Sequence, residues 1–309
     1  MDLTIAIPTY NRNELLLLHL KQLLPQLTER CRLLILDNCS PTPVQETLEP
    51  LWEQFPHVNK HIIRNKVNIG ANANILRCFE QCQSDAIWVL SDDDPPKPNG
   101  VALALEHLDL YPDCVLWNFC FDDARSATFC TRGVREMAQK LDLSANLPWV
   151  SNCIYAVEPL REQLKFGFQF AFTMLPHLAM LFMALGKEGR CCFSKERLVE
   201  LQLEGQITHA TWSKMVFALS APTLYDLPLP SDVRELLARK LFITFLGESI
   251  SLKGVTMELM LEHARRRDLK STLYYFDQIC ARGTYFNTTP LLKLQLFLYR
   301  LLLRFPHLT

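Results

Sequence analysis

The chain has 309 residues, of which 49% are hydrophobic, so it is long enough to bury a sizeable core. Its 33 acidic residues nearly balance its 32 lysines and arginines, which gives no support for a nucleic-acid-binding surface. No run of about 20 uninterrupted apolar residues is present, so the sequence predicts no transmembrane helix.

Strand-like and helix-like segments alternate over the first 121 residues. Short apolar runs predict strands at residues 3–7, 31–36, 60–63, 86–90 and 114–119. Between them, apolar residues at helical spacing predict helices at residues 14–27, 44–55, 72–82 and 99–110. Strands that alternate with helices form βαβ units, so we predict an α/β fold with a mostly parallel sheet flanked by helices.

The cysteines and the start of the chain bear on its compartment. The 11 cysteines are scattered and odd in number. The chain begins Met-Asp-Leu-Thr-Ile-Ala-Ile-Pro, which has no basic segment before its apolar residues and is typical of a first strand rather than of a signal peptide. Together these features favour reduced thiols in a cytosol.

Polar clusters follow four successive strands of the predicted sheet. They are residues 8–12 (Pro-Thr-Tyr-Asn-Arg), 37–38 (Asp-Asn), 65–70 (Asn-Lys-Val-Asn-Ile-Gly) and 92–94 (Asp-Asp-Asp). In a parallel sheet all four lie along the edge formed by the carboxyl ends of the strands, where open α/β sheets bind ligands. The sequence has no GxGxxG and no GxxxxGK[ST] motif, which argues against a dinucleotide site or a P-loop.

The cluster at residues 92–94 places three carboxylates side by side after an apolar run. Adjacent carboxylates repel one another and resist burial, so their presence at a strand end indicates a bound cation. Mg²⁺ and Mn²⁺ prefer oxygen ligands and commonly sit between one or two carboxylates and the phosphates of a substrate. The alternative is a solvated acidic turn, because Asp and the prolines that follow are turn formers.

An ordered set of motifs in this part of the chain resembles a known family. The motifs are residues 5–12 (Ile-Ala-Ile-Pro-Thr-Tyr-Asn-Arg), 34–40 (Leu-Ile-Leu-Asp-Asn-Cys-Ser), 65–74 (Asn-x-x-Asn-x-Gly-x-x-x-Asn) and 90–94 (Leu-Ser-Asp-Asp-Asp). They resemble the inverting family 2 glycosyltransferases of the GT-A fold, over roughly the first 120 residues. The Ser-Asp-Asp-Asp form and a later Ser-Asn-Cys-Ile-Tyr at residues 151–155 look most like the bacterial O-antigen and capsule branch, which includes abequosyltransferase-like enzymes.

The resemblance implies a Rossmann-like GT-A domain with a nucleotide-sugar site. The residues that it assigns to the donor are Pro8, Thr9, Tyr10, Asn11, Arg12, Asp37, Asn68, Gly70, Asn74, Asp92 and Asp93. It also implies that Asp92 and Asp94 bind Mg²⁺ or Mn²⁺, which would neutralise the leaving nucleoside diphosphate. For Asn68, Gly70 and Asn74, an ordinary loop followed by a helix cap is the alternative.

An inverting transferase needs a general base that takes the proton of the acceptor hydroxyl. The family usually offers an acidic pair at the start of a helix, whereas residues 172–180 here read Phe-Thr-Met-Leu-Pro-His-Leu-Ala-Met. The proline suits a helix start, and His177 is the titratable residue beside it. We therefore predict His177 as the base or an acceptor-site residue, with Glu158 second and Asp122 or Asp123 third. A histidine packed in the core is the alternative for His177.

The last part of the chain has a helical pattern. Residues 231–235 (Ser-Asp-Val-Arg-Glu) are a capping signature that opens an amphipathic run to residue 246. Residues 290–305 place Lys293, Arg300 and Arg304 on one stripe of a helix that is otherwise leucine-rich and aromatic. This segment predicts a packed helix, a dimer contact, or an interfacial helix on an anionic membrane.

The predicted organisation is a GT-A domain over residues 1–225 and a helical C-terminal extension over residues 226–309. Residues 1–121 form its nucleotide-sugar-binding half and residues 122–225 its acceptor-binding half, where His209 and Trp212 are candidates for a loop that closes over the donor. The sequence does not determine an oligomeric state.

The predicted activity is the transfer of one sugar from a nucleotide-sugar to a hydroxyl of a bacterial surface polysaccharide, by a single inverting displacement. The resemblance implies a lipid-linked acceptor, and hence an enzyme in the cytoplasm or peripherally on the inner face of the cytoplasmic membrane. One alternative is a sugar nucleotidyltransferase, although no Gly-rich phosphate loop follows the first strand. A catalytically inactive, nucleotide-binding scaffold is the other, because the usual acidic base is missing.

Overall fold

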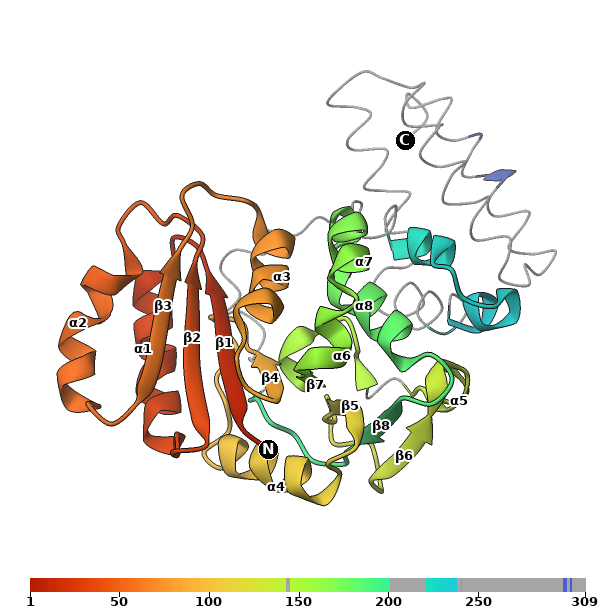
Figure 1. The fold of residues 1–309 in the computed structure, drawn as a ribbon, viewed down its shortest axis with the longest axis horizontal. Coiled ribbons are helices and arrows are strands. Elements are labelled where there is room, and N and C mark those ends of the chain that lie inside the picture. Colours follow the sequence, from red (N-terminus) through yellow and green to blue (C-terminus); the bar gives the residue numbers. More distant parts are fainter. Residues whose placement is uncertain (143–144, 201–220, 238–239, 241–296, 299–300, 302–309) are drawn as a thin grey trace. The chain divides into compact units, whose positions relative to one another are not determined.

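The computed structural model describes residues 1–142, 145–200, 221–237, 240, 297–298 and 301 (Figure 1). The chain divides into two compact units. The first is Met1–Ala171 with Leu175–Thr208, and the second is Phe172–Met174 with His209–Thr309. Every strand and α-helix whose bounds are given below belongs to the first unit.

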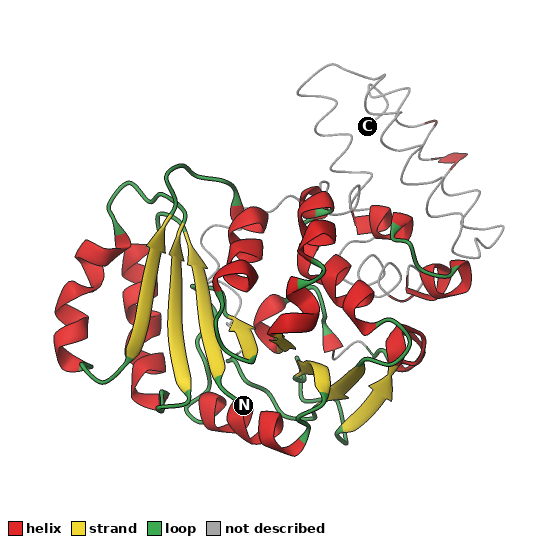
Figure 2. Cartoon of the chain, viewed as in Figure 1, coloured by secondary structure: helices red, strands yellow, loops and turns green. Residues whose placement is uncertain are grey.

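The first unit contains an eight-stranded mixed sheet in the order β3-β2-β1-β4-β7-β5-β8-β6 (Figures 1 and 2). The strands are β1 (Leu3–Thr9), β2 (Cys31–Asp37), β3 (Asn59–Arg64), β4 (Ala86–Val89), β5 (Cys114–Asn118), β6 (Phe129–Arg132), β7 (Cys153–Ala156) and β8 (Arg190–Phe193). Strands β3, β2, β1 and β4 pair in parallel. β7 runs antiparallel between β4 and β5, so β4 and β5 point the same way.

Helices flank the sheet. They are α1 (Asn13–Leu23), α2 (Val44–Gln54), α3 (Ala71–Gln81), α4 (Gly100–Leu110), α5 (Gly133–Lys140), α6 (Val157–Arg161), α7 (Leu164–Gln169) and α8 (Pro176–Leu185). The α/β fold with a mostly parallel sheet, expected from the alternating pattern, is confirmed. The predicted helix over residues 14–27 ends earlier, at Leu23, and continues as a 3₁₀ turn that contains Pro25, which has no backbone N–H to donate.

The main core lies between the sheet and the helices α1, α2 and α4. Alternate residues of β1 (Leu3, Ile5 and Ile7) are fully buried in it, together with Leu16 of α1 and Leu48 of α2. Because side chains alternate along a strand, the intervening residues of β1 face the layer that contains α3. This packing fixes the carboxyl ends of β1 to β4 at one edge of the sheet, and with them the loops that follow.

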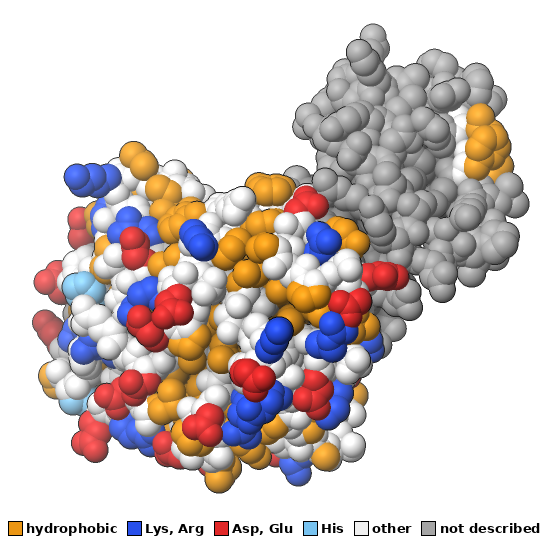
Figure 3. All heavy atoms as spheres, turned by 45° about the vertical axis from the view of Figure 1, so that its right-hand side comes forward, with side chains coloured by type: hydrophobic (Ala, Val, Ile, Leu, Met, Phe, Trp, Pro, Cys, Tyr) orange, Lys and Arg blue, Asp and Glu red, His pale blue; other side chains and the backbone are white. Residues whose placement is uncertain are grey.

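Charged side chains of both signs are interspersed over the visible face of the described residues in Figure 3, without an extended surface of one sign. No helix among the residues that the structure describes is long and apolar enough to cross a bilayer. Residues 231–237 are helical, as their capping signature predicts. The predictions for His209 and Trp212, and most of those for residues 238–246 and 290–305, lie outside the described residues.

Candidate functional site

The four polar clusters lie along the edge formed by the carboxyl ends of β1 to β4. The backbone N–H of Asn38 donates to the Thr9 carbonyl at 2.9 Å, which joins the ends of β1 and β2. The Asn65 backbone N–H donates to the Asp37 carbonyl at 2.8 Å, which joins the ends of β2 and β3. The Thr9 hydroxyl donates to Asp92 Oδ2 at 2.6 Å, which links β1 to the loop after β4. One continuous site therefore contains all four clusters.

Arg12 joins the first cluster to the triplet of carboxylates. Its Nη1 lies 2.8 Å from both Asp92 Oδ1 and Asp93 Oδ2. With Thr9 on Asp92 Oδ2 and the Ser91 hydroxyl on Asp93 Oδ1, all four oxygens of these two residues receive a hydrogen bond. Burial raises the pKa of Asp92, and the bonds from Thr9 and Arg12 oppose that rise. These two acids are thus partly neutralised by the protein itself.

Asp94 is held differently, by two neutral donors. The Trp149 indole Nε1 and the Ser151 hydroxyl both donate to its Oδ2, each at 2.6 Å. The residue is buried, and this burial raises the pKa of its carboxyl to about 6. The nearby charges of Asp93 and Asp92 add to the increase, whereas the bonds from Ser151 and Trp149 reduce it. At pH 8, Asp94 is therefore an ionised carboxylate that has no cationic partner among the described residues.

Oδ1 of Asp94 is the oxygen of the triplet that receives no hydrogen bond from the described residues. It is also not enclosed, since it is not among the buried polar atoms that lack a partner. Within the described chain, no group of three or more His, Cys, Asp or Glu side chains is arranged to hold a metal ion alone. One free carboxylate oxygen instead fits Mg²⁺ or Mn²⁺, which complete their coordination with water and substrate phosphates.

A network of asparagine amides organises the loop after β3. Asn65 Nδ2 donates to Asn38 Oδ1 at 2.9 Å and to Asn74 Oδ1 at 2.8 Å, and Asn38 Nδ2 donates to Asn68 Oδ1 at 2.8 Å. Asn74 is buried and its Nδ2 donates to the Leu36 carbonyl. The structure thus gives Asn74 an anchoring role in the fold.

The loop itself turns at Gly70, which precedes α3. Its φ is +84°, a left-handed conformation that glycine adopts without a steric cost. A Cβ added to Gly70 would meet no atom within 4 Å, so the backbone conformation, and not close packing by described residues, is the reason for glycine. Asn68 accepts the Gly70 N–H at 2.9 Å, which ties the turn to the amide network.

Asp37 is almost fully buried, with 1% of its surface exposed. Its carboxylate accepts the backbone N–H of Ser40 at 2.8 Å and of Val44 at 3.4 Å, and it forms a 2.5 Å ion pair with Arg64. In the structure Asp37 therefore holds the turn that leads into α2 and fixes Arg64 at the site edge. Direct binding of a base or ribose by Asp37 remains a prediction.

Residues 8–12 form the loop between β1 and α1. Pro8 is half-buried, and Tyr10 has 45% of its surface exposed. Asn11 has a φ of +54°, and its backbone N–H donates to the Ser40 hydroxyl at 2.9 Å. The left-handed residue and this bond bend the loop so that Arg12 can reach the carboxylates.

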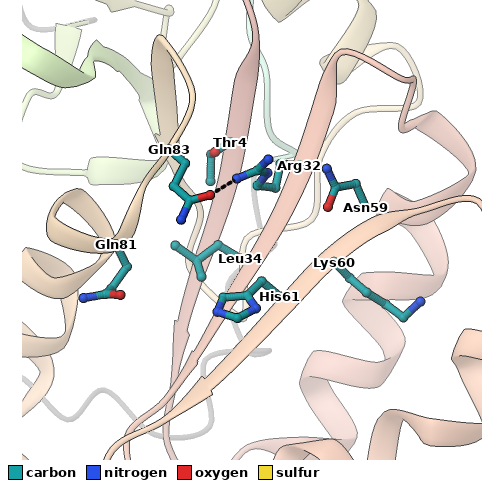
Figure 4. Close-up of a pocket in the computed structure, with 8 residues that line it drawn as sticks. All are labelled: Thr4, Arg32, Leu34, Asn59, Lys60, His61, Gln81 and Gln83. Atoms are coloured by element: carbon teal, nitrogen blue, oxygen red, sulfur yellow. Dashed lines mark hydrogen bonds between the residues drawn. The ribbon is translucent and has the colours of Figure 1, made fainter.

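A hollow of about 260 Å³ lies on the other edge of the same sheet (Figure 4). It is lined by Thr4, Arg32, Leu34, Asn59, Lys60, His61, Gln81 and Gln83, most of which stand at the amino ends of β1, β2 and β3. Arg32 Nη1 donates to Gln83 Oε1 at 2.5 Å, and the Lys60 side chain extends away from Arg32 and His61, with its Nζ 5.2 Å from the centre of the Trp52 ring. None of the candidate residues lines this hollow, so it is separate from the carboxylate site.

Residues 4–156 match the family model described as Glycosyl transferase family 2. This part of the chain belongs to glycosyl transferase family 2. It is therefore a transferase that uses a nucleotide-sugar donor. No curated protein sequence matches the chain.

Solved structures of two proteins resemble this transferase in fold. The 1–349 fragment of S. aureus TarS has a TM-score of 0.63 and 14% identity, over 93% of this chain and 83% of the fragment. The complex of this fragment with UDP-GlcNAc has the same TM-score and identity, over 90% of this chain and 82% of the fragment. The mannosyltransferase PcManGT from Pyrobaculum calidifontis, in complex with GDP-Man and Mn²⁺, has a TM-score of 0.52 and 12% identity, over 97% and 86%. At such low identity these matches show a shared GT-A fold.

The first two candidates for the base of this transferase, His177 and Glu158, do not lie exposed at the sheet edge that carries the triplet. His177 is 2% exposed, and its Nε2 lies 3.2 Å from the Leu147 carbonyl. Burial lowers the pKa of its ring to about 4. Glu158 follows β7, and the backbone N–H of the preceding Val157 donates to the carbonyl of Asp85, which precedes β4. Glu158 therefore lies at the amino end of β4, opposite the triplet. Its side chain is exposed and pairs with Arg161 at 2.9 Å.

Asp122, the third candidate, lies on the side of the triplet. It follows β5, which is parallel to β4 and ends at the same edge of the sheet. The ring of the preceding Phe121 packs edge-on against Trp149 with 5.2 Å between ring centres, and Trp149 donates to Asp94. Asp122 is thus connected to the metal-binding candidate through two side chains in contact. Asp123 turns away into an ion pair with Arg197 at 2.7 Å.

The structure adds residues that sequence reasoning did not assign to the site of the transferase. Trp149 and Ser151 hold Asp94, although only the motif containing Ser151 had been noticed. His19 of α1 is buried near the backbone of Asp92 and Asp94, and burial lowers the pKa of its ring to about 4. A histidine among the leucines of an amphipathic helix carries no local signal of such a position.

Replacing Arg12 with Ala is expected to lower the free energy of unfolding of the transferase by about 2 kcal/mol at pH 8. Removing one partner of a fully buried ion pair typically lowers the free energy of unfolding by more than this. The Arg12 side chain is 27% exposed, so water screens part of the interaction that the substitution removes. The loss should shrink at pH 4.5, because burial raises the pKa of Asp92 and of Asp94, and their protonation reduces the repulsion within the triplet. Urea denaturation at the two pH values measures this, with Arg30→Ala, an exposed ion pair with Asp109, as the control. Equal losses at both pH values contradict the expectation.

Proposed function

We propose that this transferase moves a sugar from its nucleotide-sugar donor to a hydroxyl of a bacterial surface polysaccharide, by an inverting displacement that a divalent cation assists. The observation that carries the proposal is Oδ1 of Asp94, which receives no hydrogen bond from the described residues, beside two carboxylates that Arg12 partly neutralises. The resemblance of the motifs to the O-antigen and capsule branch supports the choice of acceptor.

Asp94 and Asp92 are the proposed ligands of Mg²⁺ or Mn²⁺, and Asp92 is also assigned to the donor. When bound, the cation supplies positive charge that stabilises the leaving nucleoside diphosphate. The chain itself orders the carboxylates of the proposed cation site. Arg12 holds Asp92 and Asp93 in place, and two neutral donors hold Asp94. The Mn²⁺ and GDP-Man named for PcManGT, which has the same fold, support this assignment.

The donor site is proposed to lie along the loops at the carboxyl ends of β1 to β4. Tyr10, Asn11 and Asn68 are the predicted donor residues with exposed side chains, and are therefore those proposed to contact the nucleotide-sugar directly. Asp37 and Asn74 are proposed to act through the loops that they anchor. The UDP-GlcNAc named for TarS supports a donor at this edge of the fold.

A lipid-linked acceptor and a peripheral membrane contact complete the proposal. They rest on the family resemblance and on the stripe of Lys293, Arg300 and Arg304 in a leucine-rich segment. The boundary between a domain over residues 1–225 and a helical extension over residues 226–309 is likewise proposed from the sequence. A vesicle co-sedimentation experiment with anionic and neutral lipid measures the contact: binding to neither kind of vesicle contradicts it.

A thermal-shift screen of UDP-, GDP-, dTDP- and CDP-sugars, with and without Mn²⁺, tests the proposed donor site. A ligand at about 100 times its Kd stabilises the folded protein by roughly 2.7 kcal/mol, which is a visible rise in melting temperature. We expect a shift with one nucleotide class that increases with Mn²⁺ and that loses this increase in Asp94→Ala. The matched control is Asp113→Ala, an exposed carboxylate paired with Arg190 away from the site.

Two results would contradict the proposal. A shift that Mn²⁺ does not change removes the role of the cation, and an unaltered Mn²⁺ effect in Asp94→Ala removes the role of that residue. Hydrolysis of the stabilising nucleotide-sugar by the purified protein then separates an active transferase from an inactive nucleotide-binding scaffold. A scaffold would show the thermal shift without any release of free sugar.

A further inference from the structure

Two side chains from one short segment converge on a single oxygen of Asp94. Trp149 Nε1 and Ser151 Oγ each lie 2.6 Å from Oδ2, although they are 55 and 57 residues away in sequence. A carboxylate oxygen has two lone pairs, so two donors saturate its hydrogen-bonding capacity in the plane. Oδ2 is therefore not available to another ligand, whereas Oδ1 is.

The direction of the bond from Ser151 is set by its other contacts. The backbone N–H of Ser91 donates to Ser151 Oγ at 3.0 Å, so the hydroxyl is an acceptor on that side. Its own hydrogen then points to Asp94 Oδ2. The Ser151 carbonyl also accepts the indole N–H of Trp88, a residue of β4, at 2.8 Å. Ser151 is fully buried, and these contacts fix it to the strand that carries the triplet.

The Trp149 indole is held with equal specificity. Its ring packs edge-on against Phe121, and its backbone N–H donates to the Asn146 carbonyl at 2.9 Å. The indole has one donor and no acceptor, so its bond to Asp94 can run in one direction only. Both donors are thus preorganised before any ligand is present.

Hydrogen bonds from neutral donors leave the net charge of a carboxylate in place, whereas an arginine would offset it. Asp92 and Asp93 share the cation of Arg12, so part of their charge is already compensated. Asp94 receives hydrogen bonds from neutral donors, so it keeps its net negative charge for a cation at Oδ1. An outer group that orients a ligand and leaves its charge intact is the usual way in which proteins strengthen a metal site.

We infer that Trp149 and Ser151 are positioning residues, which orient Asp94 so that Oδ1 alone is offered to a divalent cation. This inference rests on the proposed function, because it concerns the same carboxylate. It adds two residues to the proposed site, and it assigns the contact of Asp94 with the cation to one atom, Oδ1.

The test compares Trp149→Phe and Ser151→Ala, which remove one donor each, with Asp94→Asn. Mn²⁺ alone is the probe, and its Kd is measured by the loss of the free-ion signal in electron paramagnetic resonance. We expect each single variant to weaken Mn²⁺ binding by about 10- to 100-fold, as for other partners of metal ligands. The binding of nucleotide without metal should change by less than twofold, which a general loss of structure would not permit.

The controls are conservative substitutions of buried residues elsewhere in the first unit. Trp52→Phe removes a buried indole N–H that has no partner, and Thr4→Val removes a buried hydroxyl at the opposite edge of the sheet. Both should bind Mn²⁺ as the wild type does. The melting temperature of each ligand-free variant is recorded, and if Ser151→Ala does not fold, Trp149→Phe carries the test because it retains the packed ring.

The outcomes separate this inference from the proposed function. If Asp94→Asn loses Mn²⁺ binding and both donor variants keep it within twofold, the positioning role is overturned and the metal site stands. If Asp94→Asn binds Mn²⁺ as the wild type does, the proposed metal site itself is overturned. A lower melting temperature with an unchanged Kd for Mn²⁺ identifies Trp149 and Ser151 as structural residues only, and also overturns the inference.

Discussion

Asp94→Asn is expected to reduce metal-dependent sugar transfer by about 10²- to 10³-fold and to make the ligand-free protein more stable at pH 8. The amide oxygen of Asn can still accept the bonds from Trp149 and Ser151, so the local structure should persist. The amide nitrogen then occupies the place of Oδ1 and cannot bind a cation. A loss of activity with a gain in stability distinguishes a functional carboxylate from a structural one.

The gain in stability has a sign that follows from the pKa of Asp94. Burial raises this pKa from an ordinary 3.8 to about 6, so the folded state holds the proton more tightly than the unfolded chain. Stability from this group is therefore greatest below pH 3.8 and is lost as the pH rises to 6. Above pH 6 the cost stays constant at about 3 kcal/mol, at about 1.4 kcal/mol for each pKa unit.

Urea denaturation of wild type and Asp94→Asn at pH 8 and pH 4 measures this effect. The variant should be more stable than the wild type by up to about 3 kcal/mol at pH 8, and the difference should vanish at pH 4. Saturating Mn²⁺ with the nucleotide should reverse the order at pH 8, because only the wild type binds the cation. A variant that is less stable at pH 8 contradicts the account of Asp94 as an unpaired buried charge.

Asp122→Asn is expected to lower kcat by about 10²- to 10⁴-fold without weakening donor binding, if Asp122 is the general base. Its position after β5 and the contact of Phe121 with Trp149 place it on the side of Asp94. His177→Asn should lower the melting temperature, because the ring is buried, with a much smaller effect on kcat. Glu158→Gln should change neither, because Glu158 lies at the opposite edge of the sheet.

Donor hydrolysis and transfer, measured together with the Kd for the nucleotide-sugar, decide among the three. A fall in kcat for His177→Asn that exceeds the fall for Asp122→Asn, in protein that remains folded, would restore His177 as the base. The Asp123→Asn variant is the matched control for Asp122, since its carboxylate is engaged by Arg197. An equal loss in Asp123→Asn would show that the loop, and not one carboxylate, is required.

The sequence predicted the part of the site that depends on local pattern. Alternating strands and helices place Arg12 and the triplet at the same edge of a parallel sheet, and the structure joins them by hydrogen bonds. The roles of individual polar residues in that edge were harder to predict. Asp37 and Asn74 belong to family motifs, yet both are buried, with Asp37 bonded to the backbone of the turn after β2 and Asn74 to the backbone of β2 itself. A motif gives the residue type at each position, but it does not give the direction in which the side chain points.

What the sequence by itself determined is the fold class, the family motifs and the edge of the sheet at which the polar clusters gather, because these follow from periodicity and from residues that are adjacent in the chain. The tertiary structure alone decided which carboxylate oxygen is available and which base candidates share its edge. Oδ2 of Asp94 is saturated by Trp149 and Ser151, and the antiparallel insertion of β7 carries Glu158 to the far side. Such contacts join residues more than 50 positions apart, and they arise from strand order and packing, to which no local spacing corresponds.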